Sequence, residues 1–236
     1  MNIRLFISTG LIASLAINMA SAQTYPSFPG QVTDRQTLRT QERVEELFDS
    51  GAYERAFFIY RNELAPRGDK YAQYMVGYMH LTGTGVREDP VIALAWYRLA
   101  AERGEPSVAQ ARDSLAEALS PAQIAAANVL FADLRSKFSD RALLLKLVRR
   151  DMDILRKSLT GGSSPGAASM IVIDRRYGVD SGAHYYEMVR KRLNRRLSYL
   201  KGHVEVVDVE GDPHATELVE IESEIKKLIS EIDDRQ

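Results

Sequence analysis

The stretch from Ala72 to Gly104 constrains the fold most, because small and aromatic residues alternate at helical spacing on both sides of a glycine-rich turn. In its first half, apolar side chains recur every three or four residues, at Tyr71, Met75, Tyr78 and Met79. The turn that follows, Thr82 to Gly85, contains two glycines that can adopt the left-handed conformations needed to reverse the chain. This half of the stretch predicts one short helix that ends at a tight turn.

The second half of the stretch predicts a partner helix. Asp89 can cap the free amides of a helix start, and Pro90 at the first helical position sacrifices no hydrogen bond. The inner face then carries small and aromatic residues, namely Ala93, Trp96, Tyr97, Ala100 and Ala101, and Gly104 ends the helix. Two short antiparallel helices of this kind form the unit of a helical solenoid.

These residues resemble a known repeat. The matching positions are Ala72, Gly77, Tyr78, Gly83-Thr84-Gly85-Val86, Asp89, Ala93, Trp96-Tyr97, Ala100-Ala101 and Gly104. Together they are similar to one Sel1-like repeat, a relative of the tetratricopeptide repeat. The resemblance implies a structural role for these residues. It also implies a non-catalytic adaptor that assembles protein complexes, in bacteria often at the cell envelope.

Weaker copies flank this unit. Residues 56–61 (AFFIYR) align with residues 93–98 (ALAWYR) at a constant offset, and Gly68 falls near the place of Gly104. Downstream, residues 109–119 and a helix from Ser120-Pro121 to about Phe138 indicate a degenerate third unit. Three units are about the minimum for a stable stack, and terminal units are expected to be atypical.

The N-terminus predicts export. Arg4 precedes a largely apolar run from Leu5 to Met19, and Ala20-Ser21-Ala22 fits a signal-peptide cleavage site. We expect cleavage at about Ala22 and a periplasmic or secreted protein, with an uncleaved anchor as the alternative. The chain has no cysteine, so disulfides and cysteine-ligated metals are excluded, and 45% hydrophobic residues suffice for a core.

The predicted fold class is mainly α. We expect a signal peptide (1–22), a flexible leader (23–36), Sel1-like helical repeats (37–140), a connecting helix (141–159) and a linker (160–168). The remainder, 169–236, contains short β-branched runs at 170–173 and 204–209 on either side of a helix over 184–200. We therefore expect a small strand-helix-strand element with a parallel crossover, followed by a C-terminal amphipathic helix.

The C-terminal helix is the sharpest indication of a partner. Its apolar residues follow the spacing of a coiled-coil seam, at Leu218, Ile221, Ile225, Leu228 and Ile232. About two heptads are too few to be stable alone, so the helix either docks on its own domain or pairs with another chain. Both alternatives stay open from the sequence.

The helix before it is basic, with Arg190, Lys191, Arg192, Arg195 and Arg196. These residues form a solvated or self-paired face, for which the acidic end of the C-terminal helix is the expected partner, or they contact an anionic envelope surface. The formal net charge of -1 argues against nucleic-acid binding.

Sequence patterns of enzymes are missing. The four histidines are scattered, without HExxH spacing, and neither a GxSxG elbow nor a phosphate-binding loop occurs. We therefore predict no catalytic, cofactor or metal residues and a scaffold that binds another envelope protein or a second copy of itself. The alternatives are a module that binds cell wall or an anionic polymer and, less favoured, a hydrolase.

Overall fold

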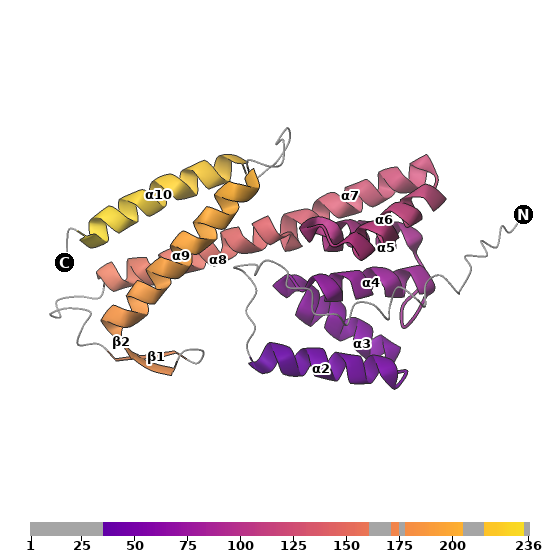
Figure 1. The fold of residues 1–236 in the computed structure, drawn as a ribbon, viewed down its shortest axis with the longest axis horizontal. Coiled ribbons are helices and arrows are strands. Elements are labelled where there is room, and N and C mark those ends of the chain that lie inside the picture. Colours follow the sequence, from indigo (N-terminus) through magenta and orange to yellow (C-terminus); the bar gives the residue numbers. More distant parts are fainter. Residues whose placement is uncertain (1–34, 161–170, 175–177, 205–214, 234–236) are drawn as a thin grey trace, which may run out of the picture.

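A computed structural model describes residues 35–160, 171–174, 178–204 and 215–233, and these ranges are mainly helical. The helices form two groups, the repeat region from α2 to α7 and a bundle of α8, α9 and α10 (Figure 1). Each group has its own buried apolar core. The prediction of a mainly α, solenoid-like fold is confirmed.

The repeat region is a stack of three helix pairs. The first pair is α2 (Arg35–Asp49) and α3 (Tyr53–Ile59), and α3 continues into the short π-helix η2 (Tyr60–Leu64) and the short 3-10 helix η3 (Ala65–Arg67). The second pair is α4 (Lys70–Thr82) and α5 (Pro90–Ala100), followed by η4 (Ala101–Arg103). The third consists of α6 (Pro106–Ala118) and α7 (Pro121–Phe138), which follow each other in the chain and both pack on α5.

Local capping explains where these helices begin. The Asp89 carboxylate accepts hydrogen bonds of 3.0 Å from the backbone amides of Val91 and Ile92 at the start of α5. At the start of α7, Ser120 and Gln123 form a reciprocal capping box, and Pro121 occupies the first turn. Both starts are as predicted, so short-range chemistry sets these boundaries.

Two neighbouring aromatic residues of α5 pack in different directions. Tyr97 lies over Gly77 of α4, and its ring stacks on that of Tyr74 at a centroid distance of 5.2 Å. Trp96 stacks instead on Phe138 at the end of α7, at 6.2 Å. Both residues are buried, as predicted, and Trp96 also reaches beyond the pair α4–α5 to α7. Trp96 joins this pair to the third one.

The second group is a bundle built around α8 (Asp140–Thr160). The other two helices, α9 (Gly182–Val204) and α10 (Ala215–Asp233), both pack on α8 (Figure 1). The helix predicted over 141–159 is thus α8, and its apolar stripe forms the middle of the second core, with Leu144, Leu145, Val148, Met152 and Leu155 buried. Ser139 both ends α7 and caps α8 by accepting a hydrogen bond from the amide of Ala142.

The predicted strand-helix-strand element is wrong. The run at 170–173 does contain a strand, β1 (Ile171–Asp174), but its partner is β2 (Gly178–Ser181), which precedes helix α9. The two strands pair antiparallel as a hairpin, and no crossover is needed to join them. β2 escaped prediction because it contains one β-branched residue, Val179, among Gly, Asp and Ser. Val204, where the second strand was expected, ends α9, and residues 205–209 lie outside the described ranges.

A polar cluster joins the start of α4 and the segment after α5 to the start of α8. Arg103 donates to both carboxylate oxygens of Asp140, at 2.7 and 3.0 Å, and to the carbonyl of Gly68. Lys70 bridges the Glu102 carboxylate at 2.7 Å and the Leu99 carbonyl at 3.2 Å. These contacts set the start of α8 against the repeat region.

Several predicted segments fall outside the described residues. The signal peptide lies there entirely, as does nearly all of the leader (23–36) and of the linker (160–168). Their boundaries, like the division of the chain into domains, stay predictions.

Trp96 provides a test of the stacking between pairs. Replacing this buried ring by alanine leaves a cavity beside Phe138, so Trp96→Ala should lower the free energy of unfolding by about 3–5 kcal/mol. Denaturant unfolding followed by circular dichroism measures this change. An unchanged midpoint would contradict the packing of α5 against α7.

Two glycines in turns form a matched pair. Gly85 and Gly51 have φ values of +70° and +79°, but a Cβ on Gly85 would lie 2.5 Å from the Tyr53 carbonyl carbon, whereas one on Gly51 meets no atom within 4 Å. Gly51→Ala should cost about 1–2 kcal/mol through backbone strain alone. Gly85→Ala should cost about 3 kcal/mol, because steric displacement adds to the strain. Thermal unfolding measures the loss of stability of each variant. Equal losses would show that the turn after α4 is not in close steric contact with α3.

Candidate protein interface

The residues of the predicted repeat signature come together around α4 and α5. Gly77, Ala93, Trp96, Tyr97, Ala100 and Ala101 are buried. Gly83, Gly85 and Gly104 have positive φ and end helices or shape the turn after α4. All nine positions therefore support the fold of the helix pair rather than present a site.

The surface that this pair supports is rich in tyrosine. Tyr71, Tyr74 and Tyr78 follow one another along α4, and Tyr60 from η2 and Tyr97 from α5 lie against them. We call these five residues the tyrosine face. Tyr71 is 38% exposed and Tyr78 is partly buried, while the other three are buried. The sequence placed Tyr71 on the apolar stripe of the helix, whereas its ring lies at the surface.

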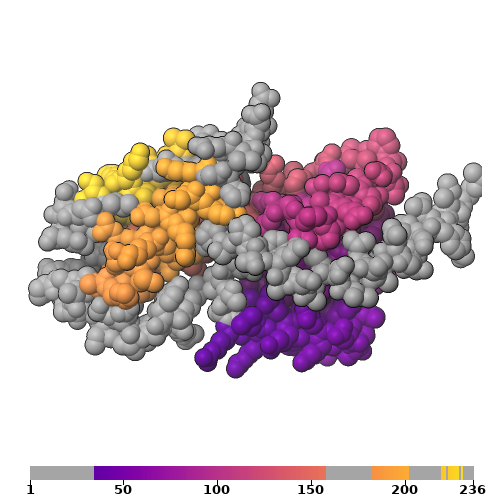
Figure 2. Space-filling view, viewed as in Figure 1, coloured from indigo at the N-terminus to yellow at the C-terminus, as the bar shows by residue number. Residues whose placement is uncertain are grey.

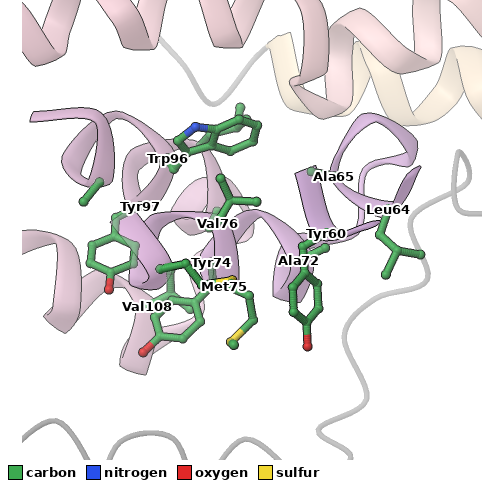
Figure 3. Packing of buried hydrophobic residues seen from close by; sticks show 14 of the residues in the cluster. Tyr60, Leu64, Ala65, Ala72, Tyr74, Met75, Val76, Trp96, Tyr97 and Val108 are labelled. Carbon is green, nitrogen blue, oxygen red and sulfur yellow. The ribbon is translucent and has the colours of Figure 1, made fainter. Parts of the chain in front are cut away.

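Ring contacts hold the tyrosine face in one arrangement. Tyr60 and Tyr71 meet edge to face at a centroid distance of 6.3 Å, and Tyr74 stacks on Tyr97. Figure 3 shows the hydroxyl groups of Tyr60, Tyr74 and Tyr97 pointing to the same side, away from Trp96 and Val76. The aromatic rings thus form the packed layer, and their polar ends line up on one side.

These hydroxyl groups stay protonated. Burial, with a smaller contribution from Glu45, raises the pKa of Tyr71 to about 12. Burial likewise raises the pKa of Tyr60, Tyr74 and Tyr97. The hydroxyl of Tyr60 is hydrogen-bonded to that of Tyr71, and the hydroxyl of Tyr97 to that of Tyr74, so these groups also tie the rings to one another.

An acidic edge borders the tyrosine face on the side of α2. Burial raises the pKa of Glu45, and the nearby Asp49 and Asp69 raise it further. Asp69 caps α4 through the amide of Ala72 and accepts a hydrogen bond of 2.7 Å from Gln41 of α2. The edge is thus tied to both helices and adds negative charge next to the exposed ring of Tyr71.

The predicted seam of the C-terminal helix lies inside the chain's own bundle. Ile221, Ile225 and Leu228 are buried in the second core, where α10 packs on α8. Arg156 of α8 reaches Glu224 of α10 at 2.7 Å. The side chains of Leu218 and Ile232 lie outside the described residues. Of the two alternatives that the sequence left open, docking in cis is the arrangement seen.

The predicted basic residues of α9 divide into two sets. Arg192 and Arg196 turn inward and contact Asp151 of α8, which is completely buried. Lys191 and Arg195 are exposed, Arg190 is half-buried, and Lys191 pairs with Glu187 at 3.4 Å. The sequence analysis expected this helix to pair with the acidic end of α10. Its two inward arginines contact Asp151 of α8 instead. With two of five cations turned inward, the support for an anionic-polymer site weakens.

Asp151 is the residue that sequence reasoning missed. Arg192 donates to Asp151 from Nη2 at 2.7 Å and from Nε at 3.1 and 3.2 Å, and Arg196 donates from Nη1. Burial lowers the pKa of Arg196, and the Asp151 carboxylate opposes this shift. A signal was present, because Asp151 lies three and seven residues after the buried Val148 and Leu144, on the apolar face of α8.

The described residues offer little for catalysis. They contain no group of three or more His, Asp or Glu residues placed to hold a metal ion. His80 is buried edge to face against Phe57, at 5.3 Å, and burial lowers its pKa. His184 is exposed at the start of α9, far along the chain. Within the same ranges, no helix is both long enough and apolar enough to cross a membrane.

Asp151 can be tested against a neighbour on the same helix. Asp151→Asn leaves two guanidinium groups without their buried counter-charge and should lower the free energy of unfolding by about 3–5 kcal/mol. Asp153→Asn is the control, because Asp153 makes only an exposed pair with Arg156 at 3.3 Å and should cost less than about 1 kcal/mol. Urea unfolding curves compare the two, and equal losses would contradict a specific role for the Asp151 cluster.

The comparisons with known proteins agree with this geometry. The family model for the Sel1 repeat matches residues 70–105, which span α4, α5 and η4. Sel1 repeats are in general protein–protein interaction modules and are typically non-catalytic. No solved structure matches the chain. The helix pair that carries the tyrosine face is therefore a Sel1 repeat, as its signature residues predicted.

Proposed function

We propose that this protein is a non-catalytic scaffold of the bacterial cell envelope that binds another protein through the tyrosine face. The observation that carries the proposal is the position of this face on the Sel1 repeat, with Tyr71 and Tyr78 reaching the surface. Tyrosine is enriched at protein interfaces, because one ring supplies both apolar contact area and a hydrogen-bonding group.

The contacts below the surface favour binding. The exposed Tyr71 is held by the ring of Tyr60 before any partner arrives, so little side-chain entropy is lost on association. Its hydroxyl group is protonated, and Glu45 adds a negative charge at the border. A complementary partner offers a backbone carbonyl or another acceptor to the Tyr71 hydroxyl and a basic side chain to Glu45.

The location in the envelope rests on the N-terminal sequence. A positive residue, an apolar run and Ala20-Ser21-Ala22 are the parts of a secretory signal. Cleavage after Ala22 would release a chain that starts at Gln23 into the periplasm or the medium. A chain without cysteine suits such a compartment, because it cannot form unwanted disulfides there.

Photo-crosslinking in living cells tests the interface. A photoreactive phenylalanine analogue at position 71 should trap the partner, whereas the same analogue at position 53 should not. Tyr53 is the matched control, because it is 40% exposed, close to the 38% of Tyr71, but belongs to α3 outside the tyrosine face. Gel mobility of the captured adducts measures the difference.

Four outcomes count against the proposal or a part of it. Equal trapping at positions 53 and 71, or none at 71, would place the interface elsewhere. Recovery of uncleaved chain in the cytoplasm would remove the envelope location and leave the interface intact. Sedimentation with purified cell wall that survives loss of the Tyr71 ring would favour the polymer-binding alternative.

A further inference from the structure

The segment that precedes α2 has a sequence pattern suited to binding along a surface. Residues 23–34 (QTYPSFPGQVTD), which lie outside the described ranges, contain two prolines, two aromatic residues and a single charged residue. Proline favours the polyproline II conformation, which has three residues per turn. In that conformation Tyr25 and Phe28 share one side and Pro26 and Pro29 a second, whereas the third side is small and polar. Two apolar sides of three favour contact with an apolar surface over contact with water.

Helix α2 brings the end of this segment close to the tyrosine face. Arg67 donates a hydrogen bond of 3.0 Å to the Thr37 hydroxyl of α2, and Gln41 donates to Asp69 at 2.7 Å. The starts of α2 and α4 therefore lie next to each other, and the two helices run in the same direction (Figure 1). Figure 2 shows α2 along the lower rim of the repeat region. The segment thus joins the described chain beside the start of α4, where Tyr71 lies.

Exposed apolar side chains continue from this point over the tyrosine face. Leu38 is 45% exposed and lies three residues before Gln41, on the side of α2 that meets the start of α4. Tyr71 follows on α4, and Tyr78 lies about two helical turns further along the same side. The 13 residues of α4 span about 20 Å, whereas residues 23–34 in polyproline II reach about 37 Å. The segment is therefore long enough to cover the whole row.

We propose that residues 23–34 of this chain bind in cis along the tyrosine face, as an extended segment, and shield it from the partner. The shielding role rests on the proposed function, whereas the contact itself rests on the geometry of the chain. Proline-rich segments characteristically dock on surfaces lined by aromatic rings, because the extended backbone is already ordered and keeps its carbonyls free to accept hydrogen bonds. The short tether adds an effective concentration of about millimolar, which a free peptide lacks.

The acidic edge explains how a partner would displace the segment. Residues 23–33 are uncharged, so the segment covers the rings but brings no counter-charge to Glu45. Glu45 lies near Asp49 and Asp69, so negative charge is concentrated there. A partner with a basic side chain gains an ion pair in addition to the ring contacts. The segment therefore selects against partners that contact the rings alone.

Photo-crosslinking on the purified full chain tests the contact. A photoreactive phenylalanine analogue at position 71 should form an adduct, within one chain, with the tryptic peptide that ends at Arg35. Phe28→Ala removes one ring of the segment, so it should weaken the contact about tenfold and lower the adduct yield. Thr24→Ala is the matched control, because Thr24 belongs to the polar side of the segment and its loss should leave the yield unchanged. Mass spectrometry of the digest measures the yields.

The same variants separate this inference from the proposed function. No adduct with the segment, an adduct that Phe28→Ala leaves unchanged, or an adduct between two chains would each overturn the contact in cis. In living cells, Phe28→Ala should increase trapping of the partner at position 71, and an unchanged level would overturn the shielding. An adduct with the segment in the purified protein, together with no trapped partner in cells, would contradict the proposed function alone.

Discussion

The absence of a side chain at Gly77 sets the distance between α4 and α5, and much of the repeat region depends on that distance. A Cβ at this position would lie 2.6 Å from the ring of Tyr97, closer than atoms can approach. Glycine therefore admits the ring, which then stacks on Tyr74 and forms part of the tyrosine face. The next residue back, Trp96, points in another direction and meets Phe138 of α7. The contact at Gly77 thus positions Tyr97 for the tyrosine face, and the adjacent Trp96 joins the same helix to α7.

Two buried ionic clusters position the second half of the molecule. The cluster around Asp140 joins Arg103 and Lys70 to the first turn of α8, and Asp140 also contributes to raising the pKa of Tyr199, so α9 approaches the same cluster. The cluster around Asp151 then fixes α9 against α8. Buried ion pairs of this kind add little net stability over apolar packing, but breaking them is costly, so they select one arrangement of the helices.

The proposed interface follows from the packing of the stack. The tyrosine face lies on the first helix of the Sel1 repeat and combines rigid rings with a protonated hydroxyl group at Tyr71 and a neighbouring acidic edge. Such a surface suits a polar, partly basic partner.

Local chemistry let the sequence alone determine the helix pair α4–α5 with its glycine turn, the cap of α5 at Asp89 and the cap of α7 at Ser120. These features depend on residues a few positions apart, so spacing reveals them. Tertiary structure decided which partner each face meets. Asp151 and Arg196 occupy apolar positions on two helices, and only the packing of α8 against α9 shows that they neutralise each other. β2 has little β-forming tendency of its own, so its assignment as a strand likewise depends on its pairing with β1. By its spacing alone, the apolar seam of α10 could pack on its own chain or on another chain. In the structure it packs on the apolar surface of α8, and this contact joins residues that lie far apart in the chain.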